Sequence, residues 1–462
     1  MPTPNFVIVP LSRLDHNGVE NIGFTFGYVF ETVDVAALQK AAQHTADKWR
    51  LLAGRVEWDA AKKNYQICVP VSESLPDDYA SIKFTTTRFP SFNLNVPSLD
   101  EDSRQVLERP PLKYFRAHDT PSSLSAYATK RLPLMAIHVS LMQNCTCVGI
   151  SFPHGVLDAT GMGMAIRGVN AALNNLEWTP PMLHPSNINI LESTLSNLRE
   201  ADSMGSDLPG ALQVMIVPMT IFSLLSFCRS FALEIFWHKS TTRAVYLGRR
   251  TVENIMVRVM KESEESGKPP VSKGDMLIAW LLKAAYLEEG CNTPNKISIS
   301  SLVSMRPTLA EINPEFGQYP HNAYTQMALP FIDIRSLSLM SLYALALRHR
   351  ERLDETRNIA YIQGVTKWFH RIGVYIVPLR RRQLDSWSFS NQVISGVEEL
   401  NLGSTQLGLW CWATPAIYDH FATIINKSRD GGYLITACVR ASRWRAIEKA
   451  LERMEGGLDP FV

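Results

Sequence analysis

The sequence predicts a mixed α/β protein built from two units of similar size. Strand-like runs alternate with runs of helical period in both the first and the last part of the chain. Between them lies a proline-rich stretch without periodicity, 179–186, which is typical of a linker. The chain has 462 residues, more than one ordinary domain needs. We therefore expect a first unit at 1–180, a crossover segment at 181–240 and a second unit at 241–462.

The first unit combines buried strands with two amphipathic helices. One helix is expected at 35–49, where apolar residues recur with helical spacing after Asp34, a good N-cap residue. Gln143 and Asn144 separate two β-rich runs and predict a tight hairpin turn. A second helix is expected at 161–173. The strands are expected at 21–30, 56–58, 64–69, 134–142 and 145–152.

The second unit shows a similar alternation. Ser272 and Asp275 are spaced as in a helix N-terminal cap, and the helix is expected to run to about residue 287. The other elements are expected to be a strand at 296–305, a helix at 336–353, a strand at 433–439 and a helix at 442–454.

The segment 208–228 has no charged residue and is about as long as a bilayer is thick. Pro209, Gly210 and Pro218 weaken a membrane-spanning helix. We therefore expect a buried or interfacial helix and no stable membrane span. A peripheral contact with a membrane is compatible with this composition.

Charge and cysteine usage exclude several classes of protein. Net charge is 46 − 44 = +2, and basic residues cluster only at 348–352 and 380–382, so we expect no nucleic-acid partner. The seven cysteines are odd in number and irregularly spaced, which argues against a disulfide framework and a zinc site. Free thiols, and no signal peptide at the N-terminus, favour a cytoplasmic protein.

The residues that indicate chemistry are His154 and Asp158. His154 follows a buried strand and precedes a helix, and such loops often carry catalytic groups. A neutral imidazole can take a proton from an alcohol as the alcohol attacks a carbonyl carbon. A carboxylate four residues later can hold the loop in place. In a chain of this composition, about 0.5 His-x-x-x-Asp spacings are expected by chance, so the spacing alone is weak evidence. The alternative is a histidine with a purely structural role.

Six stretches in chain order strengthen the catalytic interpretation. They are Leu11-Ser12-Arg13-Leu14-Asp15; Leu52-Ala53-Gly54-Arg55-Val56; His154 to Asp158; Ser272, Asp275, Ala279 and Trp280; Met305-Arg306-Pro307; and Tyr319-Pro320-His321-Asn322-Ala323. In this order they resemble the motifs of the BAHD-type acyltransferases, within the superfamily that includes nonribosomal peptide condensation domains. The resemblance covers nearly the whole chain.

The resemblance implies a fold of the chloramphenicol-acetyltransferase type, with two similar mixed-sheet α/β domains and a channel between them. His154 would be the general base, reached by acyl-CoA from one side and by a small-molecule alcohol from the other. Asp158 would support the loop by pairing with Arg306, with a simple N-cap as the alternative role. Acyl-CoA would be a co-substrate, and neither a metal nor a tightly bound cofactor would be needed. We expect a monomer.

The chain departs from the family pattern near its end. Gln406 begins the stretch 406–415, where an aspartate is usual, which points to a divergent branch of fungal appearance. The family motif on the strand that helps to hold the oxyanion has no clear match in this sequence either. Ser390 and Asn391 are our candidates for that role, with 385–387 as the competing stretch.

The first functional hypothesis is acyl transfer, with acetyl as the expected group, to a hydroxyl of a hydrophobic secondary metabolite. Transfer to an amine is an alternative acceptor chemistry. A second hypothesis is a condensation-type enzyme that uses a carrier-bound acyl donor. A third is a catalytically silent ligand-binding homologue, which the altered stretch 406–415 would permit.

Overall fold

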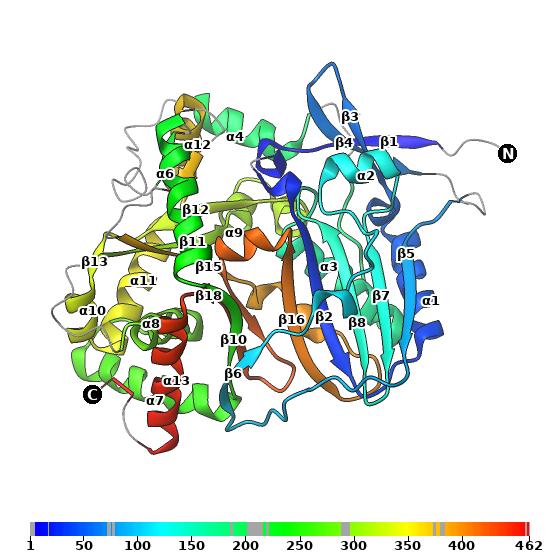
Figure 1. Cartoon of the computed structure of the whole chain (residues 1–462). Helices are drawn as coiled ribbons and strands as arrows, with labels where there is room; N and C mark the ends of the chain where they lie inside the picture. Colours follow the sequence, from blue (N-terminus) through cyan, green and yellow to red (C-terminus); the bar gives the residue numbers. More distant parts are fainter. Residues whose placement is uncertain are drawn as a thin grey trace.

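The architecture is that of two mixed β-sheets with helices packed on them (Figure 1). The computed structural model describes these residues: 5–16, 18–71, 75, 79–184, 188–200, 216–218, 221–287, 296–372, 376–378, 384–457 and 460–461. The predicted α/β class is confirmed.

One main sheet has five strands. Their order is β16 (Gln406–Thr414), β2 (Gly23–Phe30), β8 (Thr146–Pro153), β7 (Ala136–Met142) and β5 (Lys83–Phe89). Strands β2 and β8 are buried along their whole length because the sheet has packed layers on both faces. Helices α1 (Val35–Lys48) and α3 (Ala159–Leu173) share one of these cores with it. The packed sheet therefore holds the end of β8, and with it the next residue, His154, in a fixed position.

The other main sheet has eight strands. Seven follow the order β12 (Tyr324–Ala328), β11 (Lys296–Ser304), β15 (Leu384–Asn391), β17 (Thr423–Lys427), β18 (Tyr433–Val439), β10 (Thr241–Leu247) and β6 (Arg104–Glu108), and β13 (Ile332–Asp333) pairs with β11. The helices that share its core are α7 (Arg249–Ser266), α8 (Lys273–Ala285), α11 (Leu342–Thr356) and α13 (Ala441–Glu455). Every residue of α8 from Asp275 onward is buried, so α8 is the central helix of this half.

The two sheets exchange strands across the boundaries expected from sequence. Strand β6, from the first part of the chain, pairs with β10, and β16, from the last part, pairs with β2. An apolar cluster joins the sheets, with Phe115 and Trp412 stacked on one side and Tyr246 on the other. Arg109 reinforces the junction because it donates to the Cys411 carbonyl at 3.0 Å and pairs with Asp419. The halves are therefore interlocked.

The remaining elements lie around the two sheets. The strands are β1 (Phe6–Pro10), β3 (Arg55–Asp59), β4 (Asn64–Pro70), β9 (Ile216–Pro218) and β14 (Ile376–Pro378). The helices are α2 (Leu124–Lys130), α4 (Ile190–Glu200), α6 (Ile221–Ala232), α9 (Arg306–Ala310), α10 (Ile334–Leu339) and α12 (Ile359–Ile372).

Most of the elements predicted from periodicity are present within one or two residues. The Asp34 carboxylate caps α1 by accepting from the Ala37 amide at 3.0 Å. Ser272 and Asp275 form the predicted capping box of α8. The hairpin β7–β8 also forms as predicted, and the two expected strands β3 and β4 pair as a further hairpin.

The single helix predicted at 336–353 is wrong. The structure has α10 and α11 there, separated at Met340 and Ser341. Ser341 begins a new helix because its hydroxyl accepts from the Ala344 amide at 3.0 Å. The Met340 carbonyl instead accepts from the Lys283 ammonium at 2.6 Å. A side-chain cap and a buried lysine thus end the helix where periodicity alone continues it.

The uncharged segment 208–228 is only partly helical. Residues 208–215 lie outside the described part of the chain, Ile216–Pro218 is a strand paired with β14, and α6 starts at Ile221. Of the two expected alternatives, a buried helix is contradicted for α6, because most of its described side chains are exposed, and an interfacial helix is left. Among the described helices, none combines the length and hydropathy needed to cross a bilayer.

Candidate active site

The loop between β8 and α3 carries His154, and its backbone is held on both sides. The His154 amide donates to the carbonyl of Ile22, just before β2, at 2.8 Å. The His154 carbonyl accepts from the Asn322 side-chain amide at 2.8 Å. Since Ile22 and Asn322 come from distant parts of the chain, the position of His154 is a product of the tertiary fold.

The His154 side chain is half-buried, and its two nitrogens differ in access. Nδ1 is buried and has no hydrogen-bond partner among the described residues. The ring meets Phe24 edge-on, with centroids 6.0 Å apart. Burial lowers the pKa of His154 below its usual 6.5, and the nearby Asp158 charge opposes this only in part. The imidazole is therefore neutral near neutral pH, as a general base must be.

Asp158 fulfils both roles that the sequence left open. Its Oδ1 accepts from the Gly161 amide at 3.1 Å, so it is the N-cap of α3. Both carboxylate oxygens also accept from the Arg306 guanidinium, each at 2.8 Å, in a buried bidentate pair. The pairing expected between Asp158 and Arg306 is thus present, and the cap exists beside it.

Arg306 extends this anchor into the segment that follows α9. Its Nε and Nη2 donate to the carbonyls of Tyr319 and His321, both at 2.7 Å. The His321 ring lies 2.8 Å from the Val156 carbonyl through Nδ1, and burial lowers the pKa of His321 to about 4. His321 is therefore neutral, and Nδ1 carries the proton that it donates to Val156. The segment 319–323 braces the His154 loop along its length.

Asp15 is a supporting residue to which sequence reasoning assigned no role. Its carboxylate accepts from the backbone amide and the side chain of Asn322, at 3.1 and 2.7 Å, and from the amide and hydroxyl of Ser12, at 2.7 and 2.8 Å. Burial raises the pKa of Asp15 to about 7, against the effect of these bonds. Asp15 thereby orients Asn322, which holds His154. The Leu-Ser-x-x-Asp stretch was the only signal in the sequence.

Glu20 is a second residue that sequence reasoning missed. Its backbone lies against the catalytic loop, since a Cβ on Gly155 would come within 2.8 Å of the Glu20 Cα. Glycine at 155 is what permits this approach. The Glu20 Oε2 atom is buried without a partner in the described part of the chain, and burial raises the pKa of this carboxyl. No spacing in the sequence pointed to it.

Comparisons with known proteins find relatives of similar sequence and solved structures of similar fold. No family model matches the chain. Acetyltransferase BOT5 of Botryotinia fuckeliana is 22% identical and covers 96% of this chain and 90% of its own. O-acetyltransferase PaAT-2 of Phomopsis amygdali is 22% identical over 68% and 67%. The F. sporotrichioides TRI101 structure, solved with coenzyme A and T-2, matches with a TM-score of 0.65 at 15% identity over 97% of both chains. This chain is an acyltransferase, similar in sequence to fungal acetyltransferases and in fold to TRI101.

The two candidates for the oxyanion role, Ser390 and Asn391, lie at the end of β15. Asn391 lies at the end of β15 against the start of α8, since a Cβ on Gly274 would meet its side-chain amide at 2.5 Å. Ser390 is half-buried beside it. In the competing stretch, 385–387, Asp385 has a structural role instead. It pairs with Arg443 at 2.8 Å and with Arg440 at 3.4 Å. Ser390 and Asn391 thus remain the candidates.

A second polar chain in the acyltransferase has the order of a hydrolase triad. The Ser301 hydroxyl lies 2.9 Å from His349 Nε2, and His349 Nδ1 lies 2.7 Å from Asp275. All three are at most 5% exposed, and the Arg350 guanidinium also holds Asp275. A nucleophile must be reached by its substrate. This polar chain therefore anchors α8 to β11 and α11, and the half-buried His154 remains the candidate base.

Proposed function

We propose that this acyltransferase moves an acyl group, in the simplest case acetyl, from coenzyme A to a hydroxyl of a hydrophobic secondary metabolite. His154 is the general base, and Asp158 and Arg306 hold its loop. The observation that carries the proposal is the half-exposed, neutral His154, fixed by backbone bonds to Ile22 and Asn322.

The reaction needs one proton shuttle and no covalent intermediate on the enzyme. The acceptor hydroxyl gives its proton to Nε2 of His154 as its oxygen attacks the thioester carbonyl carbon. The C–O bond forms and a tetrahedral oxyanion results. Ser390 and Asn391 are the proposed groups beside it. The oxyanion collapses, the C–S bond breaks, and the CoA thiolate takes the proton from His154. The products are an ester and free coenzyme A.

The relatives support the donor and the kind of acceptor. BOT5 and PaAT-2 are described as an acetyltransferase and an O-acetyltransferase, and TRI101 was solved with coenzyme A and T-2. We extend this to a free acyl-CoA donor, a small-molecule alcohol acceptor and a monomeric enzyme. A carrier-bound donor is the competing possibility, and the donor assay below separates the two.

The test is a mass-spectrometric assay of the purified chain with acetyl-CoA and a mixture of terpenoid and polyketide alcohols. We expect an acetylated product and free coenzyme A in equal amounts. His154→Ala should lower turnover by roughly 10²–10⁴, the usual contribution of a general base. Its circular dichroism and melting temperature should match wild type. A near wild-type rate in folded His154→Ala would refute the mechanism, and product only from an acylated carrier protein would favour the condensation alternative.

A further inference from the structure

Helix α6 and the π-helical turn after it, η5 (Leu233–Trp237), carry an unusual concentration of exposed apolar side chains. On α6, Ile221, Phe222 and Leu225 are 76%, 84% and 62% exposed. On η5, Phe236 and Trp237 are 79% and 78% exposed. Scattered exposed apolar residues are normal, but large residues gathered on one short segment indicate a binding surface. We call these five residues the apolar face.

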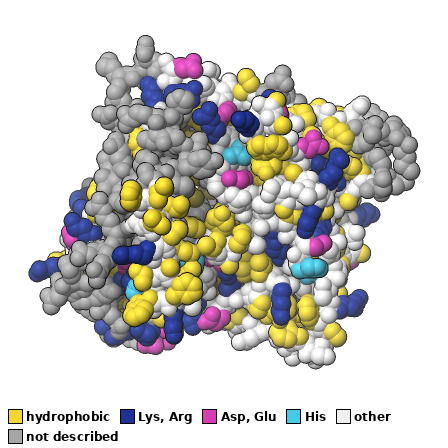
Figure 2. Space-filling model, turned by 45° about the horizontal axis from the view of Figure 1, so that its top comes forward, with side chains coloured by type: hydrophobic (Ala, Val, Ile, Leu, Met, Phe, Trp, Pro, Cys, Tyr) yellow, Lys and Arg dark blue, Asp and Glu magenta, His cyan; other side chains and the backbone are white. Residues whose placement is uncertain are grey.

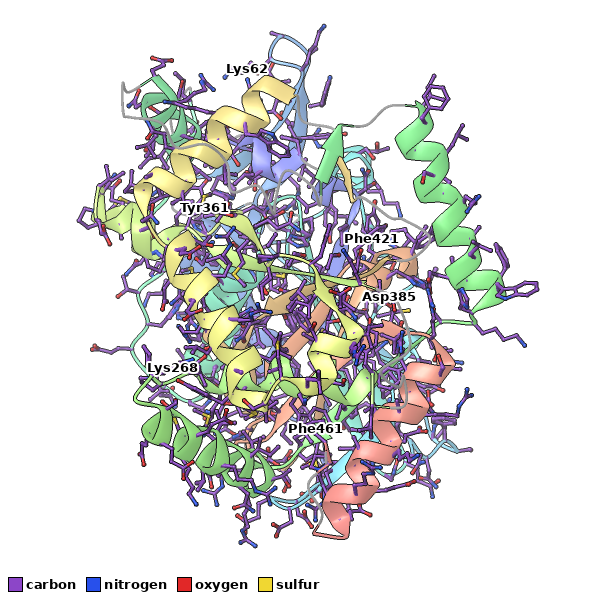
Figure 3. All side chains as sticks on the ribbon, turned by 90° about the vertical axis from the view of Figure 1, so that its left-hand side faces the viewer. Lys62, Lys268, Tyr361, Asp385, Phe421 and Phe461 are labelled. Carbon is purple, nitrogen blue, oxygen red and sulfur yellow. The ribbon has the colours of Figure 1, made fainter. Side chains whose placement is uncertain are left out.

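The pictures agree with the exposures. Figure 3 shows α6 standing away from the body of the molecule, with its side chains directed outward. Figure 2 shows hydrophobic side chains gathered on this side of the molecule. Among its described side chains, Phe231 is the one that α6 buries, at 8% exposure. The helix is thus attached at Phe231, and its other described side chains are exposed apart from the half-buried Ala232.

The charges beside the apolar face are positive. Arg229 on α6 and Lys239 just after η5 are both exposed. The acidic residue of the segment, Glu234, is half-buried and already accepts three hydrogen bonds from Arg440, at 3.2 and 3.0 Å through Nε and at 2.5 Å through Nη2. Large aromatic and aliphatic residues with cations at their edge are the composition of helices that lie in the interface of an anionic membrane.

The length of the segment fits a surface contact and not a span. Twelve α-helical residues extend about 18 Å, well short of the roughly 30 Å hydrocarbon core of a bilayer. Phe236 and Trp237 lie at its end, and Trp is enriched where membrane meets water. The apolar face would therefore enter the headgroup and upper acyl region with the helix parallel to the surface.

A row of aromatic rings leads from the buried edge of α6 toward the catalytic loop. Phe231 stacks on Phe421, which is labelled in Figure 3, with ring centroids 6.0 Å apart. The centroid of the Phe421 ring lies 5.8 Å from that of Tyr418. Burial raises the pKa of Tyr418, and the charge of the nearby Glu20 raises it further. Glu20 in turn lies against Gly155. The stacked rings thus join α6 to Tyr418, and the electrostatic interaction of Tyr418 with Glu20 places α6 on the side of the enzyme that carries the His154 loop.

We propose that α6 and η5 form a monotopic membrane contact that holds the His154 side of the enzyme at an anionic bilayer surface, from which a hydrophobic acceptor can enter. The delivery of acceptor rests on the proposed function. Membrane binding does not, so the two can fail separately.

The experiment is co-sedimentation of the full chain with vesicles of phosphatidylcholine alone or mixed with phosphatidylserine. Wild type should bind the mixed vesicles more tightly, and high salt should reduce that difference. Phe236→Ser/Trp237→Ser should lower the partition coefficient by roughly tenfold to a hundredfold. Arg229→Gln/Lys239→Gln should remove only the preference for phosphatidylserine. Because all four positions are exposed, the variants should melt at the wild-type temperature.

The controls separate this proposal from its alternatives. Trp58→Ser removes an exposed aromatic from β3, remote from α6 in sequence and in sheet, and should bind vesicles as wild type does. His154→Ala should also bind as wild type, which keeps membrane binding apart from catalysis. Absence of wild-type binding to either vesicle would overturn the proposal. A dimer in sedimentation velocity that Phe236→Ser/Trp237→Ser converts to a monomer, without vesicle binding, would assign the face to a second copy instead.

Discussion

At the scale of single residues, the site is a neutral histidine whose backbone is fixed on both sides. The bonds from Ile22 and Asn322 fix the backbone of His154, while its ring is left half-exposed. Asp15 acts one step further away by orienting Asn322. This arrangement keeps the base available to substrate, because no described residue shields it with a competing ion pair.

The lowered pKa of His154 predicts the pH dependence of the rate. A lower pKa means that the proton leaves at a lower pH, so the base is active above that value and is lost by protonation below it. The acid limb of kcat/KM against pH should therefore lie below pH 6.5, with a plateau at neutral pH. Steady-state kinetics in overlapping buffers measures it.

Glu20 provides the control for this profile, because burial raises its pKa and its titration could imitate that of His154. In Glu20→Gln the acid limb should stay in place. An acid limb above 6.5 in wild type, or one that vanishes in Glu20→Gln, would contradict the assignment to His154.

At the scale of elements, the unit that matters is the loop from β8 to α3 clamped by the start of α9. Asp158 both caps α3 and pairs with Arg306, so one carboxylate joins the helix to the other half of the chain. Arg306 also holds the segment 319–323, because it donates hydrogen bonds to the carbonyls of Tyr319 and His321. The orientation of His154 therefore depends on the Asp158–Arg306 ion pair as well as on the local sequence of the loop.

A double-mutant cycle on Asp158 and Arg306 tests this clamp. Asp158→Asn keeps a good cap but leaves Arg306 buried without its partner, which should cost roughly 3–5 kcal/mol of unfolding free energy. Loss of a cap alone would cost about 1 kcal/mol. Arg306→Met should cost a similar amount to Asp158→Asn, and the double variant less than the sum. Urea unfolding and turnover should be measured together, since both should fall. Strictly additive losses would leave Asp158 only its cap.

At the scale of the whole molecule, the halves are interlocked and meet closely at α3. Strands β6 and β16 each complete the sheet of the other half. On α3, a Cβ on Gly163 would lie 1.9 Å from the Ser395 carbonyl oxygen, and one on Gly161 would lie 2.0 Å from that of Pro320. Backbone thus packs on backbone at the helix that begins at the catalytic loop.

Gly163→Ala tests this contact. The added methyl group must push α3 away from Ser395, whose carbonyl also accepts from Arg167 at 2.6 Å. Overpacking of this kind should cost roughly 1–3 kcal/mol, and turnover should fall because α3 carries the loop with it. Gly317→Ala is the matched control, since nothing lies within 4 Å of its added Cβ. Equal melting temperatures for the two variants would show that the contact is not tight.

The sequence alone was enough to predict the α/β class, most helices and hairpins, and the pairing of Asp158 with Arg306, and it singled out His154 as the candidate base. These depend on short-range signals, such as the periodicity of 35–49, the Ser272–Asp275 cap and the ordered motifs around His154 and Arg306. The break at Met340 and Ser341 escaped prediction because a buried lysine from α8 takes the carbonyl there.

Only the tertiary structure decided how the site is held and how the halves join. Glu20 meets Gly155 and Asp15 meets Asn322 across long stretches of chain, and strands β6 and β16 pair outside the part of the sequence in which they lie. The exposure of α6 could not be predicted from the sequence either, because an apolar segment has the same residue pattern whether it packs against protein or contacts a membrane. Such contacts depend on which surfaces meet after folding, and local residue patterns carry no information about that.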